Sequence, residues 1–310
     1  MKGSKIFIIM IILAAVLGVI ALPFITNYTP GRDLASSREN RIVVINLTGT
    51  IQESGGGFMS GTISPHLVQN HLSNAAQDSS IKGVVLRLES PGGSIAASQA
   101  IASMIREYEK PIVVSMADMA ASGGYYISAP AQGIVAHPGT MTGSIGVISQ
   151  TINMDGLYEM LGLEVETFKS GEHKDMLSRT MTEEERQIMQ EISDEAYDQF
   201  VREVAEDREM DVSTVRELAT GQIYLGSQAL ELGLIDRLGG IDEAIDYLAE
   251  LNNIKDPVRY ELPPPSAFEQ LFNLGFQTFE TLKKSALGPE LILLEMIREG
   301  LPPDIRYQLR

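Results

Sequence analysis

Short runs of β-branched and aliphatic residues alternate with stretches of helical periodicity in the first part of the chain. The runs RIVVINL (41–47), GVVLRLE (83–89) and PIVVSMA (111–117) have the composition of strands, and residues 66–77 and 94–109 between them repeat apolar positions at helical spacing. The runs are almost continuously apolar, which is typical of parallel strands covered on both faces by crossover helices. The pattern predicts an α/β fold.

The later part of the chain is more helical. Three short apolar pieces, GIVA, SIGVIS and EVETF, precede a long segment of helical character from Thr182 to about Glu206. Thr182 and Glu185 have the spacing of a capping box, which predicts that the long helix starts there. From Val212 onward the pattern indicates smaller helices, with glycines such as Gly233 as stop signals.

An uncharged apolar run extends from Ile6 to Ile25 near the start of the chain. A helix of about 20 residues spans the roughly 30 Å hydrocarbon core of a bilayer, whereas a cleaved signal has a shorter apolar core. We therefore expect one transmembrane anchor. Lys2 and Lys5 place its N-terminal side in the cytoplasm by the positive-inside rule, although Arg32 weakens the asymmetry.

These patterns divide the chain into five parts. We expect a cytoplasmic N-terminus at 1–5, the anchor at 6–25, a polar linker at 26–40, a folded domain at 41–254 and a C-terminal extension at 255–310. The apolar periodicity of the extension favours an amphipathic helix packed on its own domain or on a sister subunit over a helix at the membrane surface, and its role stays open.

Charge and composition exclude several classes of function. The net charge of −17 would repel a phosphate backbone, so we expect no nucleic-acid partner. The chain has no cysteine, which excludes disulfides, thiolate catalysis and cysteine-based metal sites. Its four histidines are too scattered for a histidine-rich metal motif, and we expect neither a metal nor another cofactor.

The stretch AASGGYY places Ser122 among small residues directly after the predicted strand at 111–117. A serine at a strand-to-helix turn has an exposed hydroxyl and resembles a nucleophile elbow without the G-x-S-x-G form. By itself the pattern is more often a tight-packing serine or a helix N-cap. A catalytic serine also needs a base, an oxyanion hole and a group that orients the base.

The stretch LRLESPGGS offers the oxyanion hole, because a strand there runs into two glycines and then a helix. The backbone N–H groups of Gly93 and Gly123 are the candidate pair of donors. Gly-Gly turns before helices are common, so this is supporting evidence only. A phosphate-binding loop is the competing interpretation, but the G-K-[ST] ending and the GxGxxG spacing are missing.

Three residues are candidates for the base. His137 precedes a proline and reads as a loop residue, while His173 and Lys174 stand side by side in KSGEHKD. A lysine acts as a base only when burial lowers its pKa from about 10.4 toward neutrality. From the residues alone the choice stays open.

The order of motifs resembles one known family. SPGG, MAASGGYYIS, HPGTMTGSIGVI, FKSGEHKDM and GQIYLGSQALELGLIDRLGG follow one another as in the signal peptide peptidase A family (peptidase family S49), membrane-anchored serine proteases with a Ser-Lys dyad. The resemblance covers roughly residues 41–250 and is to the short form of the family. The chain departs from the family pattern at Glu89, at Gln132-Gly133 and at His137, none of which removes a catalytic part.

The resemblance implies a role for each candidate. Ser122 matches the nucleophile, Lys174 rather than Lys169 matches the general base, and Ser144 matches the serine that orients the lysine. Gly93 and Gly123 match the donors of the oxyanion hole. The implied fold is a crotonase/ClpP-like superhelix of repeated β-β-α units, and no cofactor is needed.

The resemblance also implies the setting. Substrates would be remnant signal peptides, together with misfolded exported segments, and partners would be further copies in a ring or dome, with an octamer among the sizes considered. The protein would be a single-pass plasma-membrane protein with an extracytoplasmic catalytic domain. Two other classes stay as alternatives: an acyl-CoA enzyme that uses the Gly-Gly turn for an enolate, and a catalytically silent oligomeric scaffold.

Overall fold

The computed structural model describes residues 40–53 and 61–261 of the 310-residue chain. The transmembrane helix expected at 6–25 and nearly all of the C-terminal extension lie outside the described residues. Within the described part of the chain, no helix has the length and apolar character needed to cross a membrane.

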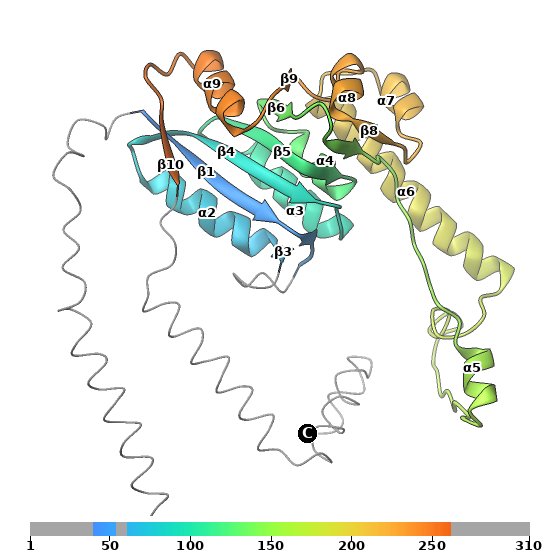
Figure 1. Cartoon of the computed structure of the whole chain (residues 1–310). Coiled ribbons are helices and arrows are strands. Elements are labelled where there is room, and N and C mark those ends of the chain that lie inside the picture. Colours follow the sequence, from blue (N-terminus) through green and yellow to red (C-terminus); the bar gives the residue numbers. More distant parts are fainter. Residues whose placement is uncertain (1–39, 54–60, 262–310) are drawn as a thin grey trace, which may run out of the picture. The chain divides into compact units, whose positions relative to one another are not determined.

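Strands and helices alternate as the sequence predicts, which confirms a mixed α/β fold (Figure 1). In chain order the elements are β1 (Arg41–Thr48), β2 (Thr50–Ile51), β3 (Thr62–Ile63), α2 (Pro65–Gln77), β4 (Ile81–Ser90), α3 (Ile95–Arg106), β5 (Ile112–Ala121), α4 (Gly123–Ser128), β6 (Gly133–Ala136), β7 (Met141–Gly143), α5 (Asp155–Met160), α6 (Glu183–Asp207), α7 (Val212–Leu218), β8 (Ile223–Leu225), α8 (Gly226–Glu231), β9 (Arg237–Leu238), α9 (Ile241–Leu251) and β10 (Val258–Glu261).

An eight-stranded sheet forms the centre of the described region. Its main path runs β10-β1-β4-β5-β6-β9, and β7 pairs with both β5 and β8. The pairs β1–β4, β4–β5 and β5–β6 are parallel, as the apolar runs predict. Strand β10 lies beside β1 at the edge, so the sheet continues beyond residue 254, where we expected the domain to end.

Both faces of the sheet are covered. Helix α9 contributes buried Leu248 and Ala249 to a core cluster with alternate strand residues such as Val44, Val85 and Val113. Helices α2 and α3 cover the opposite face (Figure 1). Burial on both faces explains why the strands read as near-continuous apolar runs instead of alternating ones.

Helix α6 starts at a capping box, which confirms the interpretation of its first residues. Thr182 Oγ1 accepts a hydrogen bond from Glu185 N at 3.2 Å, and the Glu185 carboxylate accepts one from Thr182 N at 2.9 Å. The other end of α6 is fixed to the sheet region. There the Arg208 guanidinium donates two hydrogen bonds to Asp236, and the Asp236 carboxylate also accepts a hydrogen bond from the N–H of Ile134 in β6.

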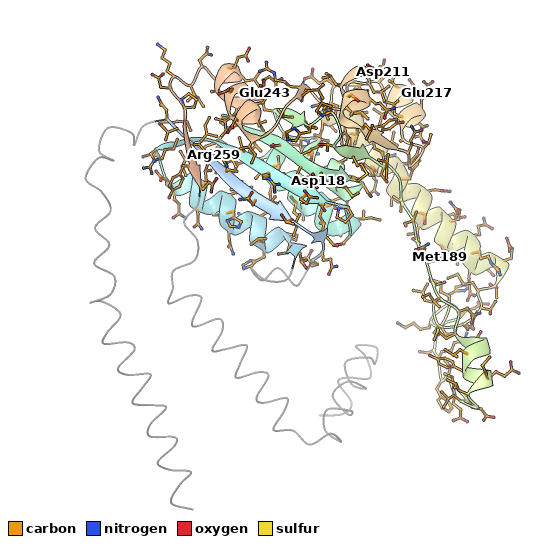
Figure 2. All side chains as sticks on the ribbon, in the orientation of Figure 1. Asp118, Met189, Asp211, Glu217, Glu243 and Arg259 are labelled. Carbon is orange, nitrogen blue, oxygen red and sulfur yellow. The ribbon has the colours of Figure 1, made fainter. Side chains whose placement is uncertain are left out.

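Residues 144–182 form a segment between β7 and α6 that we call the arm. The arm runs outward along α6, away from the sheet, and α5 lies near its far end (Figure 1). Met189, in the first half of α6, already lies beyond the sheet (Figure 2). Outside α5 the arm has no helix or strand, so the apolar pieces at 144–149 and 164–168 do not become strands.

Candidate active site

Ser122 connects β5 to α4 in a conformation that L-residues rarely adopt. Its backbone has φ 52° and ψ −120°, and its N–H donates to the carbonyl of Gly143 in β7 at 2.8 Å. The carbonyl of Ser122 in turn accepts a hydrogen bond from Tyr126 N. Such backbone costs about 1–3 kcal/mol and clusters at active sites, where it presents a side chain at a sharp turn. No N-capping hydrogen bond from the Ser122 side chain is present, so the hydroxyl is not used as a helix cap.

The Gly92-Gly93 turn approaches this serine as closely as only glycine permits. Gly92 has φ +99°, and a Cβ placed on it would lie 2.6 Å from Gly123 N and 2.9 Å from the Ser122 Cβ. Gly93 has φ +155°, and a Cβ there would lie 2.0 Å from the Ile51 carbonyl oxygen. Both glycines are therefore required by close backbone contacts as well as by their dihedral angles.

The two backbone donors expected for the oxyanion hole lie together. Ile51 forms an isolated bridge with the turn: its N–H donates to the Gly92 carbonyl, and its carbonyl accepts from the Ser94 N–H. The Gly93 N–H takes no part in this bridge. The Gly123 N–H belongs to the first turn of α4, whose donors have no intrahelical acceptor. Neither N–H has an acceptor within the described part of the chain. This arrangement suits the binding of a developing negative oxygen.

Ser144 is the first residue after β7, the strand that pairs with the end of β5 before Ser122. It also has positive φ, at 50°, and its N–H donates to the Gln222 carbonyl at 2.7 Å. Because β7 pairs with the end of β5, the two serines are held by neighbouring strands of one sheet.

One cavity of about 550 Å³ contains this group. Ser122, Gly93, Gly123 and Ser144 all line it, so the structure brings four of the five predicted site residues together. Among the described residues, no cluster of three His, Asp or Glu side chains could hold a metal ion.

The far wall of the cavity comes from α6, which the sequence reasoning missed. Ser193, Tyr197 and Phe200 line the cavity at helical spacing, and the Phe200 ring contacts Tyr126 with the centroids 4.8 Å apart. The spacing of these α6 residues is a signal that the sequence does contain. Burial raises the pKa of the Tyr126 hydroxyl, which has no hydrogen-bond partner among the described residues.

Lys174, the fifth predicted residue, lies elsewhere. It is exposed on the arm, and it does not line the cavity that holds Ser122. Its side chain makes no hydrogen bond or ion pair within the described part of the chain. The burial that a neutral lysine requires is therefore not provided by the described residues around it.

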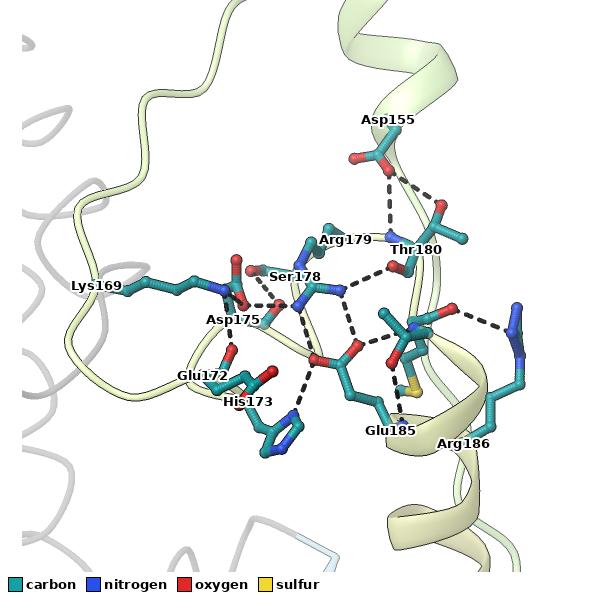
Figure 3. Close-up of polar contacts among 12 residues, drawn as sticks. Asp155, Lys169, Glu172, His173, Asp175, Ser178, Arg179, Thr180, Glu185 and Arg186 are labelled. Carbon is teal, nitrogen blue, oxygen red and sulfur yellow. Dashed lines mark hydrogen bonds and ion pairs between the residues drawn. The ribbon is translucent and has the colours of Figure 1, made fainter.

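The competing base candidates are also accounted for. The Lys169 ammonium is bound to the Asp175 carboxylate at 2.8 Å and to the Glu172 carbonyl at 2.9 Å (Figure 3). His173 Nδ1 lies 3.3 Å from Glu185 Oε1, and exposed His137 lies outside the cavity. Lys169 and His173 are thus committed to acidic or carbonyl partners, whereas the Lys174 side chain is not.

Comparison with known proteins identifies the class and then the family. Residues 104–255 match the model of peptidase family S49. A Methanocaldococcus jannaschii protein named "Putative protease MJ0651" is 37% identical over 230 residues, which cover 72% of this chain and 74% of that protein. These matches make the chain a member of a serine protease class. It belongs to peptidase family S49.

A further relative and a solved structure complete the comparison. An Enterococcus faecium protein named "Putative signal peptide peptidase SppA" is 41% identical over 223 residues, which cover 70% of this chain; the chain spans 65% of that relative's length. A solved structure of a mutant 1510-N membrane-bound stomatin-specific protease aligns at 16% identity with a TM-score of 0.49, covering 73% of this chain and 99% of that one.

Proposed function

We propose that this protein is a membrane-anchored serine endopeptidase that uses a Ser122–Lys174 dyad. The observation that carries the proposal is the meeting of Ser122, in its strained turn, with the free N–H groups of Gly93 and Gly123 in one cavity. Acyl transfer needs this combination of a nucleophile and an oxyanion hole.

The proposed reaction uses these groups together with Lys174 as the base. Neutral Lys174 takes the Ser122 hydroxyl proton as the oxygen attacks a peptide carbonyl, and the carbonyl oxygen becomes an anion held by Gly93 and Gly123. The protonated lysine then gives its proton to the leaving amine. Water then attacks the acyl-enzyme, and the lysine again acts as the base. Ser144 orients the amine of Lys174 in both steps.

The base has to reach the cavity from outside it. The described residues that line the cavity include no lysine or histidine, and Asp194 is their one carboxylate. Lys174 is exposed on an arm whose apolar side chains, such as Phe168 and Met160, are 92% and 82% exposed. We infer that a second copy of the chain covers the arm of the first and that Lys174 is desolvated in that contact. This supports a homo-oligomer, and a ring or dome would give every copy such a neighbour.

The substrate proposal combines the cavity with the anchor. The cavity is lined mainly by apolar and uncharged polar side chains, which suits an extended apolar peptide. The apolar run at 6–25 would hold the domain beside the extracytoplasmic face of the plasma membrane, where remnant signal peptides remain after precursors are cut. The name of the Enterococcus faecium relative supports this substrate class. We also propose that the domain has the crotonase/ClpP-like superhelical fold that the family resemblance implies.

The test uses the full chain in detergent micelles with a fluorogenic signal-peptide sequence as substrate. We expect Ser122→Ala and Lys174→Ala each to abolish turnover and Lys169→Ala to retain it. A shuffled hydrophilic peptide of equal length is the control for substrate class. If Lys174→Ala stays active, the base is another group, with Asp194 and His173 the next candidates.

A mixing experiment tests where the lysine comes from. Inactive Ser122→Ala and Lys174→Ala chains, dissociated and reassembled together, can form a complete dyad only between copies. We therefore expect activity to return in the mixture. If the mixture stays inactive while the two variants co-assemble, the dyad forms within one chain.

A further inference from the structure

A dense polar cluster holds the loop that carries Lys174. Glu185, in the first turn of α6, is the central member, and its side chain is only 1% exposed. It is the one charged residue among the buried residues of the described part of the chain. A buried carboxylate is costly unless several donors satisfy it, so its partners identify what the cluster is built to hold.

Glu185 is satisfied from the loop itself. The Arg179 guanidinium donates to both carboxylate oxygens, at 2.8 Å and 2.7 Å (Figure 3). The Thr182 N–H donates to one oxygen at 2.9 Å, and His173 Nδ1 lies 3.3 Å from the other. Bonding to Arg179 and then to Thr182 keeps the pKa of the Glu185 carboxyl well below its usual range, so the carboxylate stays charged.

The same arginine also fixes the other side of Lys174. Arg179 Nη2 donates to Asp175 Oδ1 at 3.0 Å, and Lys169 Nζ donates to the same oxygen at 2.8 Å. In the sequence, Lys174 therefore stands between two anchored neighbours. Figure 3 shows their bonds, from His173 to Glu185 and from Arg179 to Asp175. Its own side chain is left exposed and without a partner among the described residues.

We propose that Arg179 and Glu185 are positioning residues, which fix the loop on both sides of Lys174 so that its amine is presented at a set place to Ser122. This inference rests on the proposed role of Lys174 as the general base. Arg179 and Glu185 do not line the cavity that holds Ser122, so in this proposal they act on the reaction through Lys174. A bidentate arginine–carboxylate pair suits this task because its two parallel hydrogen bonds fix orientation as well as distance.

The size of the effect follows from how steeply proton transfer depends on placement. A displacement of about 1 Å at a catalytic group costs about 10²-fold in rate. We expect Glu185→Gln in the full chain to lower kcat by about 10²-fold while KM changes by less than about twofold. Arg179→Lys keeps the positive charge but loses the paired N–H donors of the guanidinium. We expect it to lower kcat by less than Glu185→Gln does.

Matched controls come from a second arginine–glutamate pair. Arg237 and Glu250 are joined at 2.9 Å on β9 and α9 and lie outside the cavity lining. We expect Glu250→Gln and Arg237→Lys to leave kcat unchanged. Circular dichroism and light scattering verify that every variant is folded and assembled as the unmodified chain is.

A double-mutant cycle separates positioning from general support of the fold. The readout is the rate at which a fluorophosphonate probe labels Ser122, which is measurable without a complete dyad. If Glu185 acts through Lys174, Lys174→Ala and the double variant Lys174→Ala/Glu185→Gln are labelled at equal rates. A further loss in the double variant overturns the proposal, because Glu185 would then support the site by another route.

The outcomes distinguish the two proposals. Wild-type kcat in both Glu185→Gln and Arg179→Lys, together with an inactive Lys174→Ala, overturns the positioning role and leaves the dyad standing. Full activity of Lys174→Ala overturns the dyad and the positioning role together.

Discussion

The sheet and the arm are folded by different forces. In the sheet region, strand residues such as Val43 and Val84 are fully buried between helices. In the arm, large apolar side chains including Ile148, Met160 and Phe168 are more than four-fifths exposed, while charged groups hold the loop together. The sheet region buries its apolar surface within the chain, whereas the arm leaves much of its apolar surface exposed, as the proposed contact between copies requires.

This difference also separates the reacting groups. The proposed nucleophile and oxyanion donors are held by the sheet region, and the loop of the proposed base is held by polar bonds on the arm. Each of the following predictions compares the two regions through the free energy of unfolding, measured by urea titration of the full chain in detergent.

The largest effect is expected in the core beneath α9. Leu248 is fully buried, and its side chain lies so close to Gly83 that a Cβ on the glycine would be 2.6 Å away. Leu248→Ala should lower the free energy of unfolding by about 2–5 kcal/mol because it leaves a cavity. Leu251→Ala, on the same helix but 39% exposed, is the control and should cost much less. Equal effects at the two positions would mean that α9 is not packed as described.

A smaller effect is expected at the Gly-Gly turn. Gly93→Ala places a Cβ 2.0 Å from the Ile51 carbonyl oxygen at φ +155°, so backbone must move. We expect a loss of about 1–3 kcal/mol in stability, with loss of peptidase activity because the N–H donor moves too. Gly139→Ala, where nothing lies within 4 Å of the added Cβ, is the control. Full activity in Gly93→Ala would remove this N–H from the oxyanion hole.

The arm should respond to acid through Asp175. Hydrogen bonds from Arg179 and then from Lys169 lower the pKa of the Asp175 carboxyl to about 2. Because the folded pKa lies below the unfolded one, the stabilisation is complete above about pH 4 and is lost as the pH falls toward 2. Asp175→Asn should therefore be less stable than the unmodified chain at about pH 5, and the difference should shrink steadily as the pH falls toward and through about 2. A difference that persists in acid would show that ionisation of Asp175 is not its source.

The smallest effect on stability is expected at the exposed apolar surface of the arm. Phe168 is 92% exposed, so Phe168→Ser should change the free energy of unfolding by no more than about 0.5 kcal/mol. The same change should weaken association between copies, measured by light scattering at decreasing protein concentration. Unchanged association would place the contact between copies elsewhere.

Periodicity was sufficient for the sheet region. The strands at 41–48, 81–90 and 112–121 are nearly continuous apolar runs, and their short length and β-branched residues distinguish them from buried helices. The capping box at Thr182 was equally readable because its hydrogen bonds are local. The arm was not predictable in this way, since its apolar pieces at 144–149 and 164–168 form no strand: the second piece is exposed, and the first combines buried Ile145 with exposed Ile148.

The site was predictable in part. Ser122 and the two glycines follow from the residues at strand ends, and the cavity brings them together with Ser144. The α6 wall depends on how α6 lies against α4, and the burial of Glu185 depends on how the preceding loop folds back onto α6, neither of which periodicity encodes. The role of Lys174 came from the family resemblance and stays a prediction.

The contact between Arg208 and Asp236 has a mechanical consequence. It fixes one end of α6 to the sheet, at 2.7 Å, while the loop with Lys174 lies beyond the other end. A helix of 25 residues is about 37 Å long, so a tilt of about 5° at the fixed end moves the free end by about 3 Å. The Arg208–Asp236 contact, together with the buried second half of α6, therefore sets where the far end of the helix and the loop beyond it lie.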